Sequence, residues 1–185
     1  MPERGGAKWL ARRRTRLAEA LARRRIPIGF AAAAVTILLA RPTWRTWAAG
    51  LLVALGGAGV RIWAAGHLEK GREVTRSGPY RFVRHPLYAG SIVIAGGVVL
   101  AAHSLVVAVV VALYMGLTIA AAVRTEEAEL RRAFGSTYDD YRASRAAPMA
   151  RRFSLERAMR NREHRASAGV LGGFALLALK IAAFR

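Results

Sequence analysis

The chain has 185 residues, 54% of them hydrophobic, with a mean hydropathy of +0.23 and a formal net charge of +19. It contains no cysteine, which excludes a disulfide framework, a thiolate nucleophile and a cysteine-based metal site. Because the cations lie mainly between long uncharged segments, the composition indicates an integral membrane protein, and no nucleic-acid partner is expected.

A basic segment, residues 1–25, precedes the first apolar stretch and holds nine of the cations. Leu10, Leu17 and Leu21 recur within it at helical spacing, which is typical of an amphipathic helix lying along a membrane. We interpret the segment as a topology signal and an anchor for anionic lipid head groups, with RNA binding as the weaker alternative.

Five apolar segments are candidate membrane helices. They cover residues 26–40, 44–66, 87–102, 104–123 and 168–184. A bilayer core of about 30 Å needs about 20 helical residues, so the second and fourth are long enough and the others must recruit flanking residues. The third and fourth meet at His103 almost without a turn, which predicts a tight hairpin. The expected fold is therefore all-α and polytopic, with about five transmembrane helices.

The distribution of lysine and arginine gives the orientation. Residues 1–25, 67–86 and 124–167 hold 9, 5 and 11 of them, or 25 of the 30. The positive-inside rule makes these segments, and hence the N-terminus, cytoplasmic, and five spans then place the C-terminus outside. Trp44 and Trp47 fall where an interfacial aromatic belt is expected. A composition rich in Ala, Arg and Gly is typical of bacteria, so the expected location is a bacterial inner membrane.

Small residues in the second and third segments predict close helix packing in lipid. The glycines concerned are Gly56, Gly57, Gly59, Gly96 and Gly97. Arg61 stands out because a cation inside a span is a functional candidate by default. Its place about one turn before the end of the second segment favours an extended side chain that snorkels to the cytoplasmic interface.

The run GPYRFVRHPLYAG, residues 78–90, combines cations, an imidazole and phenols where the third segment begins. Gly78 and Pro79 predict a turn. Pro86 disfavours a helical backbone at His85 and suits the first position of a helix, so the third helix is predicted to begin inside the motif.

This helix start is a setting for an anion. Free backbone N–H groups and the positive end of the helix dipole would lie beside Arg84 and His85, where they favour a carboxylate or a phosphate. Tyr88 follows one turn later, and Gly90 leaves room for a ligand or for another helix. The alternative interpretation is an ordinary interfacial loop of basic and aromatic anchors.

The second informative run, RTEEAELRRAFGSTYDDYRAS at residues 124–144, follows the fourth apolar segment. The helix is predicted to continue into the cytoplasm up to Phe134, before a glycine. Because the hairpin returns to the membrane face from which it started, Glu126 and Glu127 are predicted to lie near Arg84 and His85. Together these groups suit a zwitterion, whereas the simpler interpretation of the acids is a solvated helix face.

RHPLYAG at 84–90, preceded by GPY, and EEAELRRAFGSTYDDY at 126–141 resemble the two signatures of the isoprenylcysteine carboxyl methyltransferase and phospholipid methyltransferase family. Both occur in the family's order, separated by one hairpin, and the resemblance covers about residues 50–148. It implies a helical membrane enzyme that uses S-adenosylmethionine, bound at the cytoplasmic face, and releases S-adenosylhomocysteine.

Carried over residue by residue, the resemblance implies catalytic roles for Glu127, Glu126 and His85, with Glu127 as the essential acid. It implies a cofactor pocket formed by Tyr80, Arg84, His85, Pro86, Leu87, Tyr88, Gly90, Glu126, Tyr138 and Tyr141. The last two tyrosines would belong to a lid. No metal is expected, because the four histidines lie in separate segments.

These observations divide the chain into a basic cytoplasmic segment 1–25, a methyltransferase core 26–148, and a basic linker with a C-terminal helix, 149–185. The expected function is methyl transfer to a lipophilic acceptor, such as a carboxylate or an amine, that reaches the site from the bilayer. Two alternatives remain: an NADPH-dependent membrane reductase of the sterol-reductase type, and a non-catalytic basic membrane scaffold.

Overall fold

The computed structural model describes residues 27–184, which form helices and contain no strand. The basic segment 1–25 and its predicted amphipathic helix lie outside the described residues. The helices are, in chain order, Pro27–Leu39, α2 (Trp44–Ala65), the 3-10 turn η1 (Gly78–Arg81), α3 (Pro86–Ala102), α4 (Leu105–Phe134), α5 (Ser136–Arg142), α6 (Leu155–Arg160) and α7 (Glu163–Ala183). The all-α prediction is therefore confirmed for this part of the chain.

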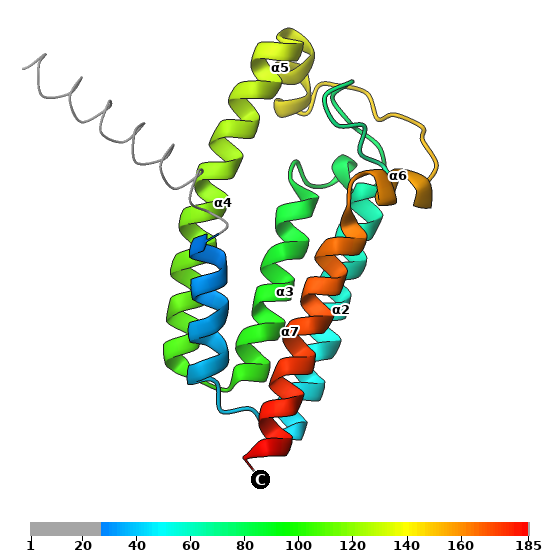
Figure 1. Ribbon diagram of the computed structural model, residues 1–185. Coiled ribbons are helices and arrows are strands. Elements are labelled where there is room, and N and C mark those ends of the chain that lie inside the picture. The colour runs from blue at the N-terminus through cyan, green and yellow to red at the C-terminus, as the bar shows by residue number, and fades with distance from the viewer. Residues whose placement is uncertain (1–26, 185) are drawn as a thin grey trace, which may run out of the picture.

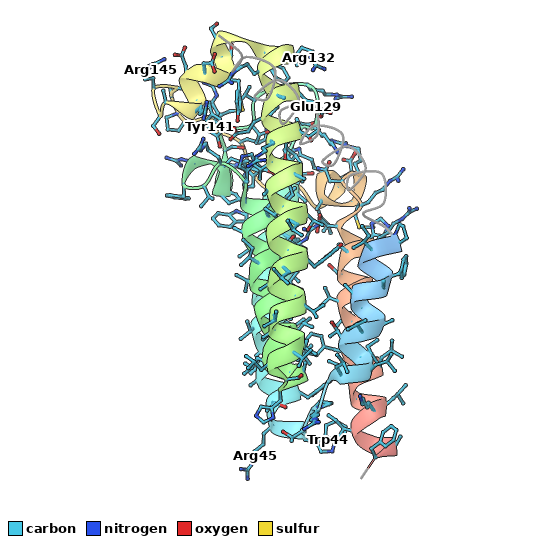
Figure 2. The ribbon with its side chains drawn as sticks, turned by 90° about the vertical axis from the view of Figure 1, so that its left-hand side faces the viewer. Trp44, Arg45, Glu129, Arg132, Tyr141 and Arg145 are labelled. Carbon is cyan, nitrogen blue, oxygen red and sulfur yellow. The ribbon has the colours of Figure 1, made fainter. Side chains whose placement is uncertain are left out.

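The long helices run side by side, and successive ones point in opposite directions (Figure 1). The loop between α2 and α3 lies at the same end of the bundle as α5 and α6, whereas the α3–α4 turn and the end of α7 lie at the other. Figure 2 places Glu129, Arg132 and Tyr141 at the first end and Trp44 and Arg45 at the second. The predicted alternation therefore brings the two informative motifs to one end.

Three helices, α2, α4 and α7, are long and apolar enough to cross a membrane. The helix Pro27–Leu39 and α3, which has 17 residues, are apolar but shorter. The length and composition of the three helices support the prediction of an integral membrane protein. Complete crossing by the two shorter helices stays a prediction.

The helix ends follow from short-range signals. Thr43 and Ser104 accept hydrogen bonds from backbone N–H groups in the first turns of α2 and α4, as capping residues do. His103 adopts a left-handed conformation (φ 47°, ψ 47°), which lets the chain reverse at once between α3 and α4. As predicted, α4 continues beyond its apolar part to Phe134, and it ends at Gly135, where φ is 47°.

Close packing of α2 on α3 is confirmed at two of the predicted glycines. A Cβ added at Gly57 would lie 2.7 Å from the carbonyl oxygen of Gly90, and one at Gly97 would lie 2.7 Å from the amide nitrogen of Ala54. These backbones approach so closely that only glycine fits. Gly56, Gly59 and Gly96 have open space around the position of a Cβ, so they take no part in this contact.

The packing of α7 and α4 differs along their lengths. Near the end remote from the motifs, α7 packs on α2, where the Trp47 Nε1–H donates to the carbonyl oxygen of Phe174 at 2.8 Å. In α4, Val107 is buried close to the turn, whereas Leu113 and Leu117 are 62% and 58% exposed. Such apolar exposure suits a helix that faces lipid.

Arg61 has a partner that the sequence did not predict. Its guanidinium pairs with Glu163 at the start of α7, and its side chain is only 20% exposed. No local pattern in the sequence indicates this partner, and extension of the side chain to the membrane interface stays a prediction.

Candidate active site

The segment before α3 presents the motif as predicted. Gly78 has a φ of 55°, and a Cβ there would lie 2.5 Å from Cδ2 of His67, so glycine is required on both counts. His85 keeps a non-helical backbone, with φ −128° and ψ 64°, and Pro86 occupies the first position of α3, fully buried. The motif therefore spans the segment before α3 and the first turns of that helix.

The end of α4 returns to this motif. His85 Nε2 lies 3.4 Å from Glu127 Oε1, and its Nδ1 lies 3.8 Å from Glu126 Oε2. The guanidinium of Arg84 lies 3.6 Å from Glu127 Oε1. The predicted juxtaposition of the two motifs is therefore observed.

The imidazole of His85 lies between the carboxylates of Glu126 and Glu127, an arrangement suited to binding cations and transferring protons. The His85 side chain is 17% exposed and Glu127 is 23% exposed, so neither belongs to a fully solvated helix face. Each ring nitrogen of His85 has its own acidic neighbour, and the ring also lies 5.8 Å from that of Tyr88. The cluster is equipped to attract a cation and to hold or pass a proton.

Helix α5 closes this end with two tyrosines. The hydroxyl of Tyr141 donates to the backbone carbonyl oxygen of Tyr80 at 2.8 Å. Tyr138 is 1% exposed, and its hydroxyl is buried near Glu127 without a hydrogen bond of good geometry. The rings of Tyr138 and Tyr141 lie 6.4 Å apart, so α5 forms one aromatic cover.

The phenols of this cover keep their protons at neutral pH. Burial, assisted by the charge of Tyr138, raises the pKa of Tyr141 to about 12. Burial and the nearby charge of Glu127 raise the pKa of Tyr138, and burial with the charge of Glu126 raises that of Tyr80 well above its ordinary value. All three tyrosines therefore keep their phenolic protons, and Tyr141 donates its proton to the carbonyl oxygen of Tyr80.

A cavity of about 340 Å³ lies among these elements. Its walls are the start of α3, the C-terminal half of α4, Tyr141 of α5, and the loop of residues 68–75. Of the predicted cofactor-binding residues, it is lined by Tyr80, Arg84, His85, Pro86, Leu87, Tyr88, Glu126 and Tyr141. The structure therefore gathers most of the predicted set around one space.

Three predicted residues lie outside this lining. Glu127 meets the cavity residues through His85 and Arg84, and Tyr138 is packed beneath α5. Gly90 faces α2, where a Cβ would lie 2.7 Å from the carbonyl oxygen of Gly57. Of the two uses foreseen for Gly90, close approach of a helix is the one observed.

Acidic residues that the sequence reasoning missed also line the cavity. Glu129 lies one turn after Glu126 on α4. This spacing places both acids on one face of the helix, so it could have indicated Glu129 as a neighbour of the site. Glu69 and Glu73 come from the loop after α2, where no motif announces them. The loop after α2 therefore forms one wall of the cavity, whereas the sequence predicted only its cytoplasmic location.

The C-terminal linker holds this loop. Arg151 Nη1 lies 2.6 Å from a carboxylate oxygen of Glu73, and Arg157 Nε lies 2.8 Å from one of Glu69. The hydrogen bond from Arg157 lowers the pKa of Glu69. Asn161 Nδ2 donates to the backbone carbonyl of Ala65 at the end of α2 and to that of Leu68 in the loop that follows, at 2.9 and 3.0 Å. The linker therefore ties down one wall of the cavity.

A second, more open space adjoins the first within the apolar part of the bundle. This groove of about 520 Å³ lies among the helix Pro27–Leu39, α3 and α4, and most of its lining is apolar. It shares Tyr88, Thr118 and Ala122 with the cavity. The groove and the cavity therefore share part of their walls.

Comparison with known proteins gives one family and two relatives. The family model described as phospholipid methyltransferase matches residues 44–137, about half of the chain. Cobalt-zinc-cadmium resistance protein CzcN of Cupriavidus metallidurans is 35% identical over 108 residues, which cover 54% of this chain and 50% of the relative. Nickel-cobalt-cadmium resistance protein NccN of Alcaligenes xylosoxydans xylosoxydans is 34% identical over 120 residues, covering 60% and 55%.

The extent of these matches is limited. The chain spans about half the length of the curated relatives that it matches. No solved structure matches. The family match ends at residue 137, so α6, α7 and most of α5 lie beyond it.

Proposed function

The chain belongs to the phospholipid methyltransferase family, and on this premise we propose that it transfers a methyl group from S-adenosylmethionine to a lipophilic acceptor at the cytoplasmic face of a membrane. The observation that carries the proposal is the meeting of His85 with Glu126 and Glu127 beside a cavity. This cluster joins the two motifs whose order and spacing resemble the family's signatures.

The cavity suits this cofactor by its chemistry. S-adenosylmethionine carries a carboxylate, an ammonium, a sulfonium and an aromatic base. Arg84 and Lys70 offer cations for the carboxylate, whereas Glu126 and Glu129 offer negative charge for the cationic groups. Tyr80 and Tyr88 add aromatic surface, and the volume of about 340 Å³ lies within the usual range for small-molecule sites.

When bound, the cofactor supplies an electrophilic methyl group, whose bond to sulfur breaks as an acceptor lone pair forms the new bond, leaving S-adenosylhomocysteine. Much of the work of the protein is then to align the acceptor and to exclude water, which Tyr141 and the rest of α5 do as a cover. An amine or hydroxyl acceptor must also lose a proton, for which Glu127 or His85 is placed, whereas a carboxylate needs no base.

The adjoining groove supports a lipophilic acceptor. It lies along α3 and α4, its lining is mostly apolar, and it reaches the cavity at Tyr88 and Thr118. A lipid chain in this groove would keep its apolar surface out of water while its head group approaches the polar cluster. The acceptor therefore enters from the side, through the bilayer.

The proposed membrane is a bacterial inner membrane, with the site on its cytoplasmic side. The clustering of cations at the end that carries the site (Figure 1) supports this orientation, because residues 67–86 and 124–167, which include the last turns of α4, hold 16 of the 30 lysines and arginines. These cations also favour anionic lipid head groups as neighbours.

The proposal is tested by calorimetric titration of the detergent-purified protein with S-adenosylhomocysteine, with NADPH as a parallel ligand. We expect saturable binding of S-adenosylhomocysteine, weakened in His85→Ala because the cavity then loses the imidazole that lines it. Binding of NADPH alone would favour the reductase alternative, and binding of neither ligand would favour the scaffold.

A further inference from the structure

A buried ion pair joins α2 to α7 just below the candidate site. Arg61 Nη2 lies 2.7 Å from Glu163 Oε1, and Arg61 Nε lies 3.0 Å from the other carboxylate oxygen. The Glu163 side chain is only 7% exposed. This two-pronged contact uses one edge of the guanidinium and leaves the second terminal nitrogen for another partner.

The second terminal nitrogen reaches α3. Arg61 Nη1 donates to Ser91 Oγ at 2.6 Å and to the carbonyl oxygen of Leu87 at 3.3 Å. Ser91 Oγ itself donates to the same carbonyl oxygen at 2.9 Å. Leu87 lies in the first turn of α3 and lines the cavity. Arg61 therefore contacts a residue of the cavity wall.

The surrounding interface explains why such a contact matters. Near the site, α2 and α3 approach through Gly57 and Gly90, which have no side chains to interdigitate. Small residues allow close contact, but they offer no side-chain polar group that would make directional hydrogen bonds between the two helices. A Cβ at Gly90 would lie 2.7 Å from Cγ of Arg61, so this glycine also makes room for the arginine.

We propose that Arg61, held by Glu163, is a positioning residue that sets the first turn of α3, and with it His85 and Leu87, against the acidic end of α4. Its guanidinium fork supplies the directional contacts that the glycine interface lacks. Glu163 begins α7, which lies beyond the residues that the family model matches, so a helix outside that region takes part in shaping the site. The catalytic consequence rests on the proposed function, whereas the structural one does not.

A spin-label distance measurement tests the positioning directly. Because the chain has no cysteine, Val83→Cys before α3 and Arg132→Cys at the end of α4 give two unique labels at exposed positions. The test variant is Arg61→Gln with Glu163→Gln, which removes both charges and leaves no uncompensated ion in the bundle. The matched control is Lys180→Met, which removes the contact of α7 with two backbone carbonyls at the opposite end.

We expect the distance distribution between the labels to broaden in the double variant and to stay as in the parent in Lys180→Met. Ser91→Ala leaves the ion pair in place but removes the shortest contact of Arg61 with α3, so it should broaden the distribution in the same direction. An unchanged distribution in the double variant, or equal broadening in Lys180→Met, overturns the proposal.

Calorimetry separates this inference from the proposed function. We expect the Kd for S-adenosylhomocysteine to rise about tenfold in the double variant, the effect of losing a charged hydrogen-bond contact. Equal affinity in the double variant and the parent overturns the link between Arg61 and the site. If the parent binds no S-adenosylhomocysteine, the proposed function fails, and the label distances alone decide whether Arg61 positions α3.

Discussion

Removing one hydroxyl from the cover of the cavity should weaken cofactor binding by a defined amount. Tyr141→Phe keeps the aromatic ring and removes the hydrogen bond to the carbonyl oxygen of Tyr80, which is 2.8 Å long. Tyr80 is 8% exposed, so its carbonyl finds no easy replacement in solvent. A neutral hydrogen bond contributes about 1 kcal/mol net, within a range of about 0.5 to 1.5 kcal/mol.

This free energy translates into affinity if α5 must be closed for binding. Since about 1.4 kcal/mol corresponds to a factor of ten, about 1 kcal/mol predicts about a fivefold rise in the Kd for S-adenosylhomocysteine. Calorimetric titration of the detergent-purified variant measures it. The matched control is Arg145→Gln, which breaks an ion pair with Asp140 whose side chains are 66% and 51% exposed, and which should leave the Kd unchanged.

Two results would refute this reasoning. An unchanged Kd in Tyr141→Phe would mean that the bond to Tyr80 is not coupled to the cavity. A similar loss in Arg145→Gln would mean that binding responds to the general stability of α5 rather than to this bond.

The remaining predictions concern pH, catalysis and packing. The pKa of Tyr141 is raised from its ordinary 10.0 to about 12 in the folded protein, so its bond contributes fully below pH 10 and is lost as the pH rises towards 12; in Tyr141→Phe, affinity measured against pH should lack this alkaline component. Glu127→Gln should abolish methyl transfer, measured with labelled S-adenosylmethionine, while the protein stays folded and inserted, and normal turnover would remove Glu127 from the mechanism. Gly57→Leu should lower the melting temperature in detergent by overpacking α2 against α3, at a cost of at least about 1 to 3 kcal/mol, whereas Gly56→Leu meets open space and should not; equal effects would contradict the packing described.

Much of the architecture followed from signals that act over a few residues. Pro86 starts α3, Gly135 ends α4, and the near absence of a turn at His103 returns α4 to the end where α3 begins. These local rules were enough to predict that His85 would meet Glu127, 42 residues later. Hydropathy and the placement of cations likewise predicted the membrane helices and their alternation, because burial in lipid depends on each segment by itself.

Contacts between helices distant in sequence were decided only by the tertiary structure. The pairing of Arg61 with Glu163, 102 residues apart, has no local signature, and the sequence did not predict it. Gly90 was expected beside a ligand or a helix, and only the approach of α2 selected the helix. The acidic wall at Glu69 depends in the same way on an arginine of the C-terminal linker. Which face a helix turns inward, and which loop covers it, is settled by the simultaneous packing of several helices, and this information is spread over the whole chain rather than held in any one segment.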